Sequence, residues 1–250
     1  MRILLFADIH GNAQALEAVV GDSARHGPYD LTICAGDLAW AGPRPRLVLQ
    51  HVRDLCREDP TGTAGGAICL MGNCDRFLLD DFEQVLPPGK RAKRFWHQRK
   101  WMLDHLTSAD LGFLRRLPFQ HRVGPAPGQD LLVVHANPHN LDDPVSVDMT
   151  DEELASVIGD EEFRVLAFGH IHVPAVWQWR GRLLVNIASV GLPRDGDTRA
   201  AYSVLTWSNG RWHVAQYRVN YEVGMVAEDM RKSGLPRGEH FAKRLLAARY

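Results

Sequence analysis

The amino-acid sequence predicts an α/β fold, because short apolar runs recur along the chain and helical patterns lie between and after them. Each run is β-branched or aliphatic and ends in a polar, usually glycine-containing tip, as expected for strands that are buried on both faces. The 250 residues suit one domain with a sizeable core. Two small domains would also fit this length, but no linker-like segment divides the chain, so we expect a single domain over residues 1–250.

The apolar runs and their tips follow one another as Arg2–Ala7 before Asp8–Asn12, Leu31–Ala35 before Gly36-Asp37, Ala67–Met71 before Gly72–Asp75, Leu131–Val134 before His135–Pro138, and Arg164–Phe168 before Gly169–His172. Between the first two runs, Leu16, Val19 and Val20 fall on one face of a predicted helix over residues 13–26, which favours a β-α-β start. Open α/β sheets place their ligands at the carboxyl ends of the strands, so we expect the polar tips to converge.

The rest of the chain predicts a helical middle and a β-rich end. Residues 77–123 are expected to be helical and to form a cap or rim, interrupted at Pro87-Pro88-Gly89 and restarting as a helix near Thr107. Two hairpins are predicted to follow, pairing Ala175–Trp179 with Leu183–Ile187, and Ala201–Trp207 with Trp212–Val219. The tail from Val223 onward predicts two short helices separated by Gly234-Leu235-Pro236.

Composition excludes several classes of protein. A formal net charge of −1 gives no bulk attraction to nucleic acid or membranes. The apolar start is too short for a secretion signal, and no segment approaches about 18 uninterrupted apolar residues, so we expect a cytoplasmic protein without membrane association. The four cysteines form no CxxC pair, which argues against structural zinc and a disulfide framework; they are Cys34, Cys56, Cys69 and Cys74.

Carboxylate, amide and imidazole side chains gather at the predicted strand tips. They are Asp8, His10, Asp37, Asn73, His135, His170 and His172. Taken singly, each has an ordinary structural explanation as a turn or surface residue. Taken together, they suit borderline first-row metals, and the absence of thiolates argues against a closed zinc site. In the DxH and HxH pairs, an extended strand would project both side chains from one face. So many ligands suit two ions about 3.5–4 Å apart, which can clamp a phosphoryl group and generate a hydroxide nucleophile.

These motifs, in this order, resemble the five motifs of the calcineurin-like metallophosphoesterases. Asn186–Arg194 also resembles a segment that follows the HxH motif in the small bacterial phosphodiesterase branch, where glycine usually occupies the position of Ala188. The resemblance covers roughly Met1 to Val219. It implies a four-layer α/β/β/α sandwich of two mixed sheets flanked by helices.

The resemblance also implies roles for the candidate residues. Asp8, His10 and His172 would bind the first metal, and Asn73, His135 and His170 the second, with Asp37 bridging the two and Asp75 orienting a neighbouring group. Two divalent ions are therefore expected. Mn²⁺ is the first choice, with Fe, Zn or Ni as alternatives, because all accept these ligands. The implied reaction is hydrolysis of a phosphodiester, or of a phosphomonoester, by a metal-activated hydroxide.

One position departs from the pattern. Many family members have a histidine, proposed to protonate the leaving oxygen, where this chain has Cys74. A thiol of ordinary pKa is a weaker donor, so Cys74 is expected in the site without a conventional acid role, and diesters or activated esters are favoured over plain monoesters. His139 is either its replacement or a solvated loop histidine. Arg194 either contacts a phosphate oxygen or pairs with Asp195 or Asp197.

The basic, aromatic stretch Lys90–Trp101 has two interpretations. It would serve as a lid that attracts a phosphate-rich substrate, or as an amphipathic helix with solvated cations, which we favour. The expected function is a metal-dependent phosphoesterase acting on a small or nucleotide-like phosphoester. Alternatives within the superfamily are a protein Ser/Thr phosphatase and a dinucleoside polyphosphate hydrolase. A non-catalytic scaffold of the same fold is disfavoured because every ligand position is filled.

Overall fold

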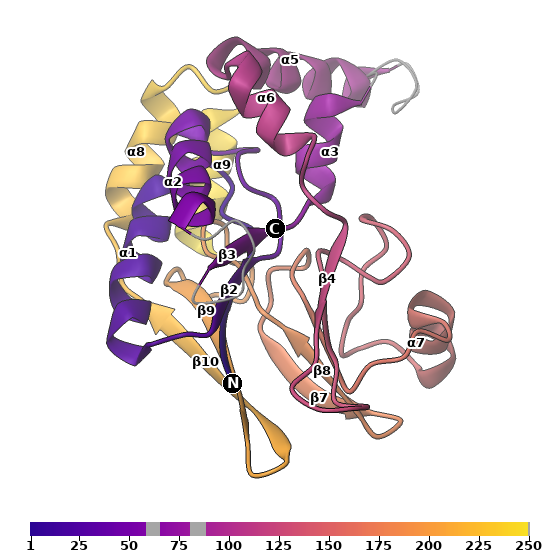
Figure 1. Cartoon of the computed structure of the whole chain (residues 1–250). Coiled ribbons are helices and arrows are strands. Elements are labelled where there is room, and N and C mark those ends of the chain that lie inside the picture. Colours follow the sequence, from indigo (N-terminus) through magenta and orange to yellow (C-terminus); the bar gives the residue numbers. More distant parts are fainter. Residues whose placement is uncertain (59–65, 81–88, 250) are drawn as a thin grey trace.

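The computed structural model describes residues 1–58, 66–80 and 89–249, and contains two five-stranded sheets with helices outside them (Figure 1). The strands are β1 (Arg2–Phe6), β2 (Leu31–Cys34), β3 (Ala67–Cys69), β4 (Gln120–Val123), β5 (Leu131–Val134), β6 (Val165–Phe168), β7 (Ala175–Trp179), β8 (Arg182–Asn186), β9 (Ala200–Ser208) and β10 (Arg211–Val219). The helices are α1 (Ala13–Ser23), the 3-10 turn η1 (Ala24–His26), α2 (Pro45–Glu58), α3 (Asn73–Leu79), α5 (Lys90–His105), α6 (Ser108–Leu114), α7 (Asp151–Ile158), α8 (Val223–Lys232) and α9 (Gly238–Ala247).

Both sheets are mixed. The first has the order β10-β9-β1-β2-β3, in which β1, β2 and β3 are parallel and β9 is antiparallel to β1. The second has the order β4-β5-β6-β8-β7, with β5, β6 and β8 parallel and both edge strands antiparallel to their neighbours. The polar tips therefore follow parallel strands of the two sheets, so that the chain delivers them to one end of the molecule.

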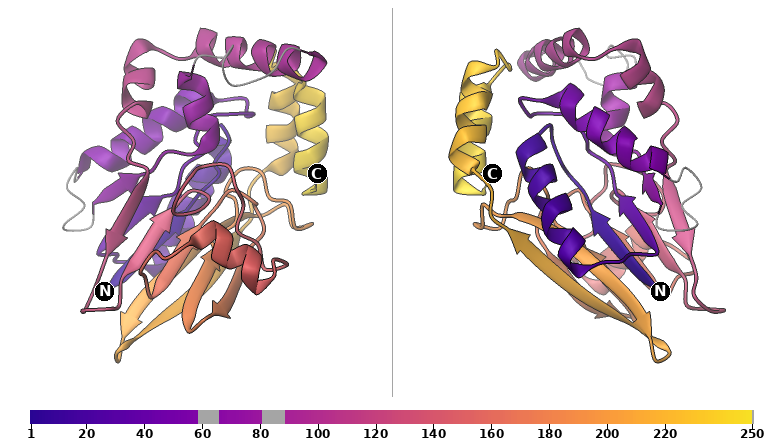
Figure 2. Two further views of the ribbon diagram at one scale, coloured as in Figure 1. Left: turned by 90° about the vertical axis from the view of Figure 1, so that its right-hand side faces the viewer. Right: turned by 60° about the vertical axis from the view of Figure 1, so that its left-hand side comes forward.

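The sheets pack face to face around a shared apolar layer, and helices cover their outer faces (Figure 2). Successive residues of β5 show the alternation: Leu131 and Val133 face the other sheet, whereas Leu132 and Val134 pack outward beneath α7. Helices α1, α2, α8 and α9 lie on the side of the first sheet, whereas α3, α5 and α6 lie beyond the ends of the strands (Figure 1). The predicted four-layer sandwich is thus confirmed.

The predicted helical middle is wrong at its end, because residues 120–123 form β4 and not a helix. This strand pairs antiparallel with β5, with Val123 opposite Leu131. Its alternating exposure matches an edge strand, and this short pattern is too weak to outweigh the helical context before it. Pro87 and Pro88, the predicted break, lie outside the described residues.

Two helices were not expected from the sequence. Helix α2 begins at Pro45, a favoured first helical residue, and α7 begins behind a capping box of Thr150 and Glu153. Within residues 1–58, 66–80 and 89–249, no helix combines the length and hydropathy needed to traverse a bilayer.

Candidate active site

The polar tips meet where the parallel strands end, but they are not extended. Five of the predicted ligands have left-handed backbone conformations, with φ of 56° at Asp8, 49° at His10, 57° at Asp37, 67° at His170 and 61° at His172. The expectation that each DxH or HxH pair lies on a strand is therefore wrong, since β1 ends at Phe6 and β6 at Phe168. Such conformations cost about 1–3 kcal/mol each and persist where the surroundings impose them, typically at functional sites.

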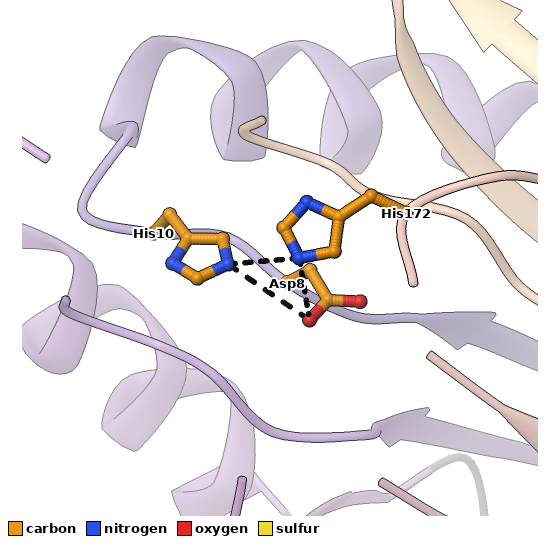
Figure 3. A group of neighbouring side chains, drawn as sticks. All are labelled: Asp8, His10 and His172. Carbon is orange, nitrogen blue, oxygen red and sulfur yellow. Dashed lines mark hydrogen bonds and ion pairs between the residues drawn. The ribbon is translucent and has the colours of Figure 1, made fainter. Parts of the chain in front are cut away.

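The first cluster joins Asp8 and His10 with His172 (Figure 3). The His10 Nδ1–H donates to the Trp40 carbonyl at 2.8 Å, and the His172 Nδ1–H donates to the Leu192 carbonyl at 2.5 Å. These carbonyls accept only, so in each neutral ring Nε2 carries a lone pair. The two Nε2 atoms lie 3.1 Å apart, and the His172 Nε2 lies 3.3 Å from Asp8 Oδ1. In the neutral state, the two Nε2 atoms and Asp8 Oδ1 face one another with no hydrogen between them. A bound cation would stabilise this arrangement.

The second cluster has the same character. The His135 Nδ1–H donates to the Ala35 carbonyl at 2.8 Å, so in the neutral ring Nε2 is an acceptor, 2.9 Å from Asn73 Oδ1. The His170 Nδ1 lies 3.3 Å from the same Asn73 oxygen. Asp37 stands between the clusters, with Oδ2 3.6 Å from His10 Nε2 and Oδ1 3.6 Å from His135 Nε2.

The burial of these residues, as well as their geometry, is consistent with a metal centre. Asp8 is fully buried, and its Oδ1 has no hydrogen-bond partner among the described residues. Burial opposes ionisation of Asp8, but the neighbouring imidazoles, His172 foremost, hold the pKa of this carboxyl well below its usual value. Burial, reinforced by His172, lowers the pKa of His10 to about 4, so this ring is a neutral ligand near pH 7. A buried oxygen of this kind needs a partner, and a divalent cation supplies one.

Supporting contacts hold the ligand loops in place. The Asp75 carboxylate is fully buried and accepts backbone N–H bonds from Asp37 (2.8 Å), Leu38 (3.0 Å) and Gly72 (3.0 Å). The Ser189 hydroxyl donates to the Asp8 carbonyl at 2.7 Å, so the segment after β8 braces the first ligand loop. Ala188, in that segment, has φ of 71°, which accounts for the preference for glycine at this position.

A match to a family model identifies the family. The family model described as calcineurin-like phosphoesterase matches residues 1–174. The chain belongs to the calcineurin-like phosphoesterase family.

The chain is similar to an uncharacterized protein of Methanocaldococcus jannaschii, with 26% identity over 269 residues, covering 99% of this chain and 98% of the relative. It is also similar to the crystal structure of a metallophosphoesterase from Sphaerobacter thermophilus, with 27% identity, a TM-score of 0.75 and 99% of each chain covered. A hypothetical protein from Pyrococcus horikoshii shares the fold, with 18% identity, a TM-score of 0.81, and 99% of this chain and 98% of that chain covered.

The family makes this protein a phosphoric ester hydrolase, and its members use divalent metals. In this phosphoesterase, a cavity of about 340 Å³ opens beside the two clusters. Its lining includes the predicted residues His10, Asp37, Asn73, Cys74, His170, His172 and Arg194. The Arg194 side chain thus lines the cavity, whereas the carboxylates of Asp195 and Asp197 pair with Arg218 and Arg199.

Two predicted residues of the phosphoesterase behave differently from each other. Cys74 lines the cavity, and its backbone N–H donates to Asp37 Oδ1 at 2.9 Å. Burial, followed by the charge of Asp37, raises the pKa of the Cys74 thiol well above its usual value. His139 is not brought to the site, because Asn137 Oδ1 accepts its backbone N–H and turns the loop, and its Nε2 lies 2.9 Å from the Ile158 carbonyl. All four cysteines are free, as expected.

Several cavity residues of the phosphoesterase were not foreseen. Helix α5 contributes Phe95 and Gln98, and the C-terminal helical segment contributes Arg237, Phe241 and Arg244. Phe241 and Arg244 are three residues apart and share one face of α9, and Arg237 directly precedes this helix. That periodicity was the available signal, but it does not say which structure the face contacts.

Proposed function

We propose that this protein hydrolyses phosphodiesters with two divalent metal ions. One ion would be held by Asp8, His10 and His172, and the other by Asn73, His135 and His170. Asp37 would bridge them, because each of its carboxylate oxygens faces a different cluster. The observation that carries the proposal is the pair of buried imidazoles whose Nε2 atoms lie 3.1 Å apart while their Nδ1 atoms face backbone carbonyls.

Two divalent ions in this position would supply an activated water and neutralise charge on the phosphoryl oxygens. The chain's own residues would orient the ester. Arg194, whose backbone N–H donates to the His172 carbonyl at 3.2 Å, would present its guanidinium to a phosphoryl oxygen. Cys74 would remain a neutral thiol beside Asp37 and would not protonate the leaving group. This favours diesters and activated esters, whose leaving groups need little protonation.

The cavity supports a small substrate. Its volume of about 340 Å³ lies at the lower end of the range for small-molecule sites. Helix α5, from the predicted rim over residues 77–123, supplies part of the wall, and we propose that residues 1–250 act as one domain around it. We propose Mn²⁺ as the native metal, with Fe, Zn or Ni as alternatives, because imidazole and carboxylate ligands suit all of them.

The test uses metal-stripped protein. We would titrate it with Mn²⁺, determine the number of ions bound by calorimetry, and compare hydrolysis of bis-p-nitrophenyl phosphate with that of p-nitrophenyl phosphate. We expect two ions per chain and faster turnover of the diester. Asp37→Asn should weaken metal binding and reduce turnover by more than about 100-fold, because changes to residues that only support a metal ligand already cost about 10–100-fold.

The matched control is Asp104→Asn, which removes an exposed carboxylate from α5 that pairs with Lys100. It should change neither metal binding nor turnover. A single bound ion, or turnover that survives chelation, would refute the dinuclear proposal.

A further inference from the structure

A buried amide faces the cavity from the side of α5. Gln98 is only 3% exposed and lines the cavity, and its Nε2 has no hydrogen-bond partner among the described residues. A buried N–H donor without a partner costs about 1–3 kcal/mol. Buried donors are almost always satisfied in folded proteins, so a cavity-lining donor of this kind points to an acceptor on a ligand.

The adjoining wall carries two cations from the end of the chain. Arg237 and Arg244 line the same cavity, and the Arg237 guanidinium lies 5.6 Å from the centre of the Phe241 ring. Arg237 makes no ion pair within residues 1–58, 66–80 and 89–249. Among the described lining residues, Asp37 is the one carboxylate. This concentration of positive charge is local, since the whole chain has a formal net charge of −1.

The two guanidiniums from the end of the chain exceed what a simple diester requires. A phosphodiester carries a single negative charge, and the two divalent ions of the proposed function, opposed by Asp8, Asp37 and the activated hydroxide, already balance it, with Arg194 beside them. Two further guanidiniums on a separate element are therefore suited to a second anionic group. Trp40, Phe95 and Phe241 add apolar surface to the same cavity, where a flat organic group would pack.

We propose that the substrate is a nucleotide-sized phosphodiester that carries a second anionic group, a phosphate, away from the bond that is cleaved. Arg237 and Arg244 bind that phosphate, and the Gln98 amide donates a hydrogen bond to the same end of the substrate. This inference rests on the proposed function for the position of the cleaved bond. The inference assigns a role in substrate specificity to the C-terminal helical segment, which lies beyond residues 1–174, the part matched by the family model.

The experiment compares two esters that differ only in the second phosphate: thymidine 5′-(p-nitrophenyl phosphate) with and without a 3′-phosphate. The Mn²⁺-loaded enzyme should show a kcat/KM at least about 10-fold higher for the 3′-phosphorylated ester, because a hydrogen bond to a charged group contributes a tenfold effect or more. Arg237→Met and Gln98→Met should each reduce this preference by about 5–10-fold through KM.

Lys243→Met is the matched control, because it also removes one cation from the C-terminal helical segment, but at an exposed residue that pairs with Glu239. It should keep the preference intact. A second measurement avoids catalysis: metal-free protein should bind thymidine 3′,5′-bisphosphate at least about 5-fold more tightly than thymidine 5′-phosphate, and Arg237→Met should abolish the difference.

Equal turnover of the two esters together with equal binding of the two nucleotides would overturn the inference, while hydrolysis itself would stand. A preference that Lys243→Met reduces as much as Arg237→Met would also overturn it, since the effect would then come from general charge. Absence of metal-dependent hydrolysis of every ester would instead refute the proposed function, and the binding measurement would still decide the inference about Arg237.

Discussion

The buried Asp75 carboxylate is expected to be the main support of the bridging ligand, and its removal should be costly. It accepts three backbone N–H groups at 2.8–3.0 Å from Asp37, Leu38 and Gly72. Each hydrogen bond to a charged group contributes about 1.5–3 kcal/mol. Burial, with the charge of Asp37 adding to it, raises the pKa of Asp75 to about 7, and this desolvation offsets part of the gain.

We therefore expect Asp75→Ala to lower the free energy of unfolding by about 3–5 kcal/mol, as when one partner of a buried charged pair is removed. For a chain of this size, that corresponds to a decrease in Tm of about 10 °C. Asp75→Asn keeps one oxygen acceptor and loses the other, so it should cost about 1–2 kcal/mol. Asp75→Ala should also weaken metal binding, because the backbone N–H of Asp37 would lose its acceptor.

The assay is urea denaturation in chelator, followed by tryptophan fluorescence, so that folding is measured apart from metal binding. Asp160→Ala, which removes an exposed carboxylate, should change the free energy of unfolding by less than about 0.5 kcal/mol. If Asp75→Ala costs less than about 1 kcal/mol, or if the Asn and Ala variants are equally destabilised, the three N–H bonds are not the main support of the loop.

Three further perturbations test other parts of the structure. Asp110→Ala should cost about 1–2 kcal/mol in urea denaturation, because it removes the capping box of α6 and the bond from Arg53 at 3.0 Å. Burial opposes ionisation of Asp110, but hydrogen bonds from Thr107 and Arg53 hold its pKa below the usual value. The stabilisation by Asp110 should therefore be fully present above about pH 4, and it should be lost as the pH falls through the lowered pKa of the folded protein. Gly72→Ala should abolish Mn²⁺ binding, measured by calorimetry, because a Cβ at this position would lie 2.2 Å from Asp37 Oδ1. The circular dichroism spectrum should remain that of the folded protein, and unchanged Mn²⁺ binding would contradict the prediction. Chelating the metals should lower Tm by about 10 °C in a calorimetric scan, and an unchanged Tm would show that the folded protein binds no ion tightly.

Local pattern was enough to predict the order of the fold and the identity of the clustered side chains. The runs ending at Phe6 and Val134 were recognisable because buried strands are short and apolar, and the tips after them because polar residues interrupt such runs abruptly. The hairpin β9–β10 was recognisable from Asn209-Gly210. Edge strand β4 was missed because its alternation spans four residues only and becomes clear only beside β5.

Only the tertiary structure determines how the side chains of the site are oriented. The lone pairs at His10, His135 and His172 point inward because carbonyls of Trp40, Ala35 and Leu192, distant in the chain, accept the opposite ring N–H groups. Likewise, Arg237 directly precedes α9 and Arg244 lies within it, and the packing of α9 beside the cavity brings both residues to the site. The sequence by itself determines which groups are available and where strands end, since these depend on neighbouring residues. The convergence of lone pairs and charges depends on contacts between residues far apart in the chain, which only the folded chain makes. The imidazoles of His10 and His172, for example, are 162 residues apart in the sequence.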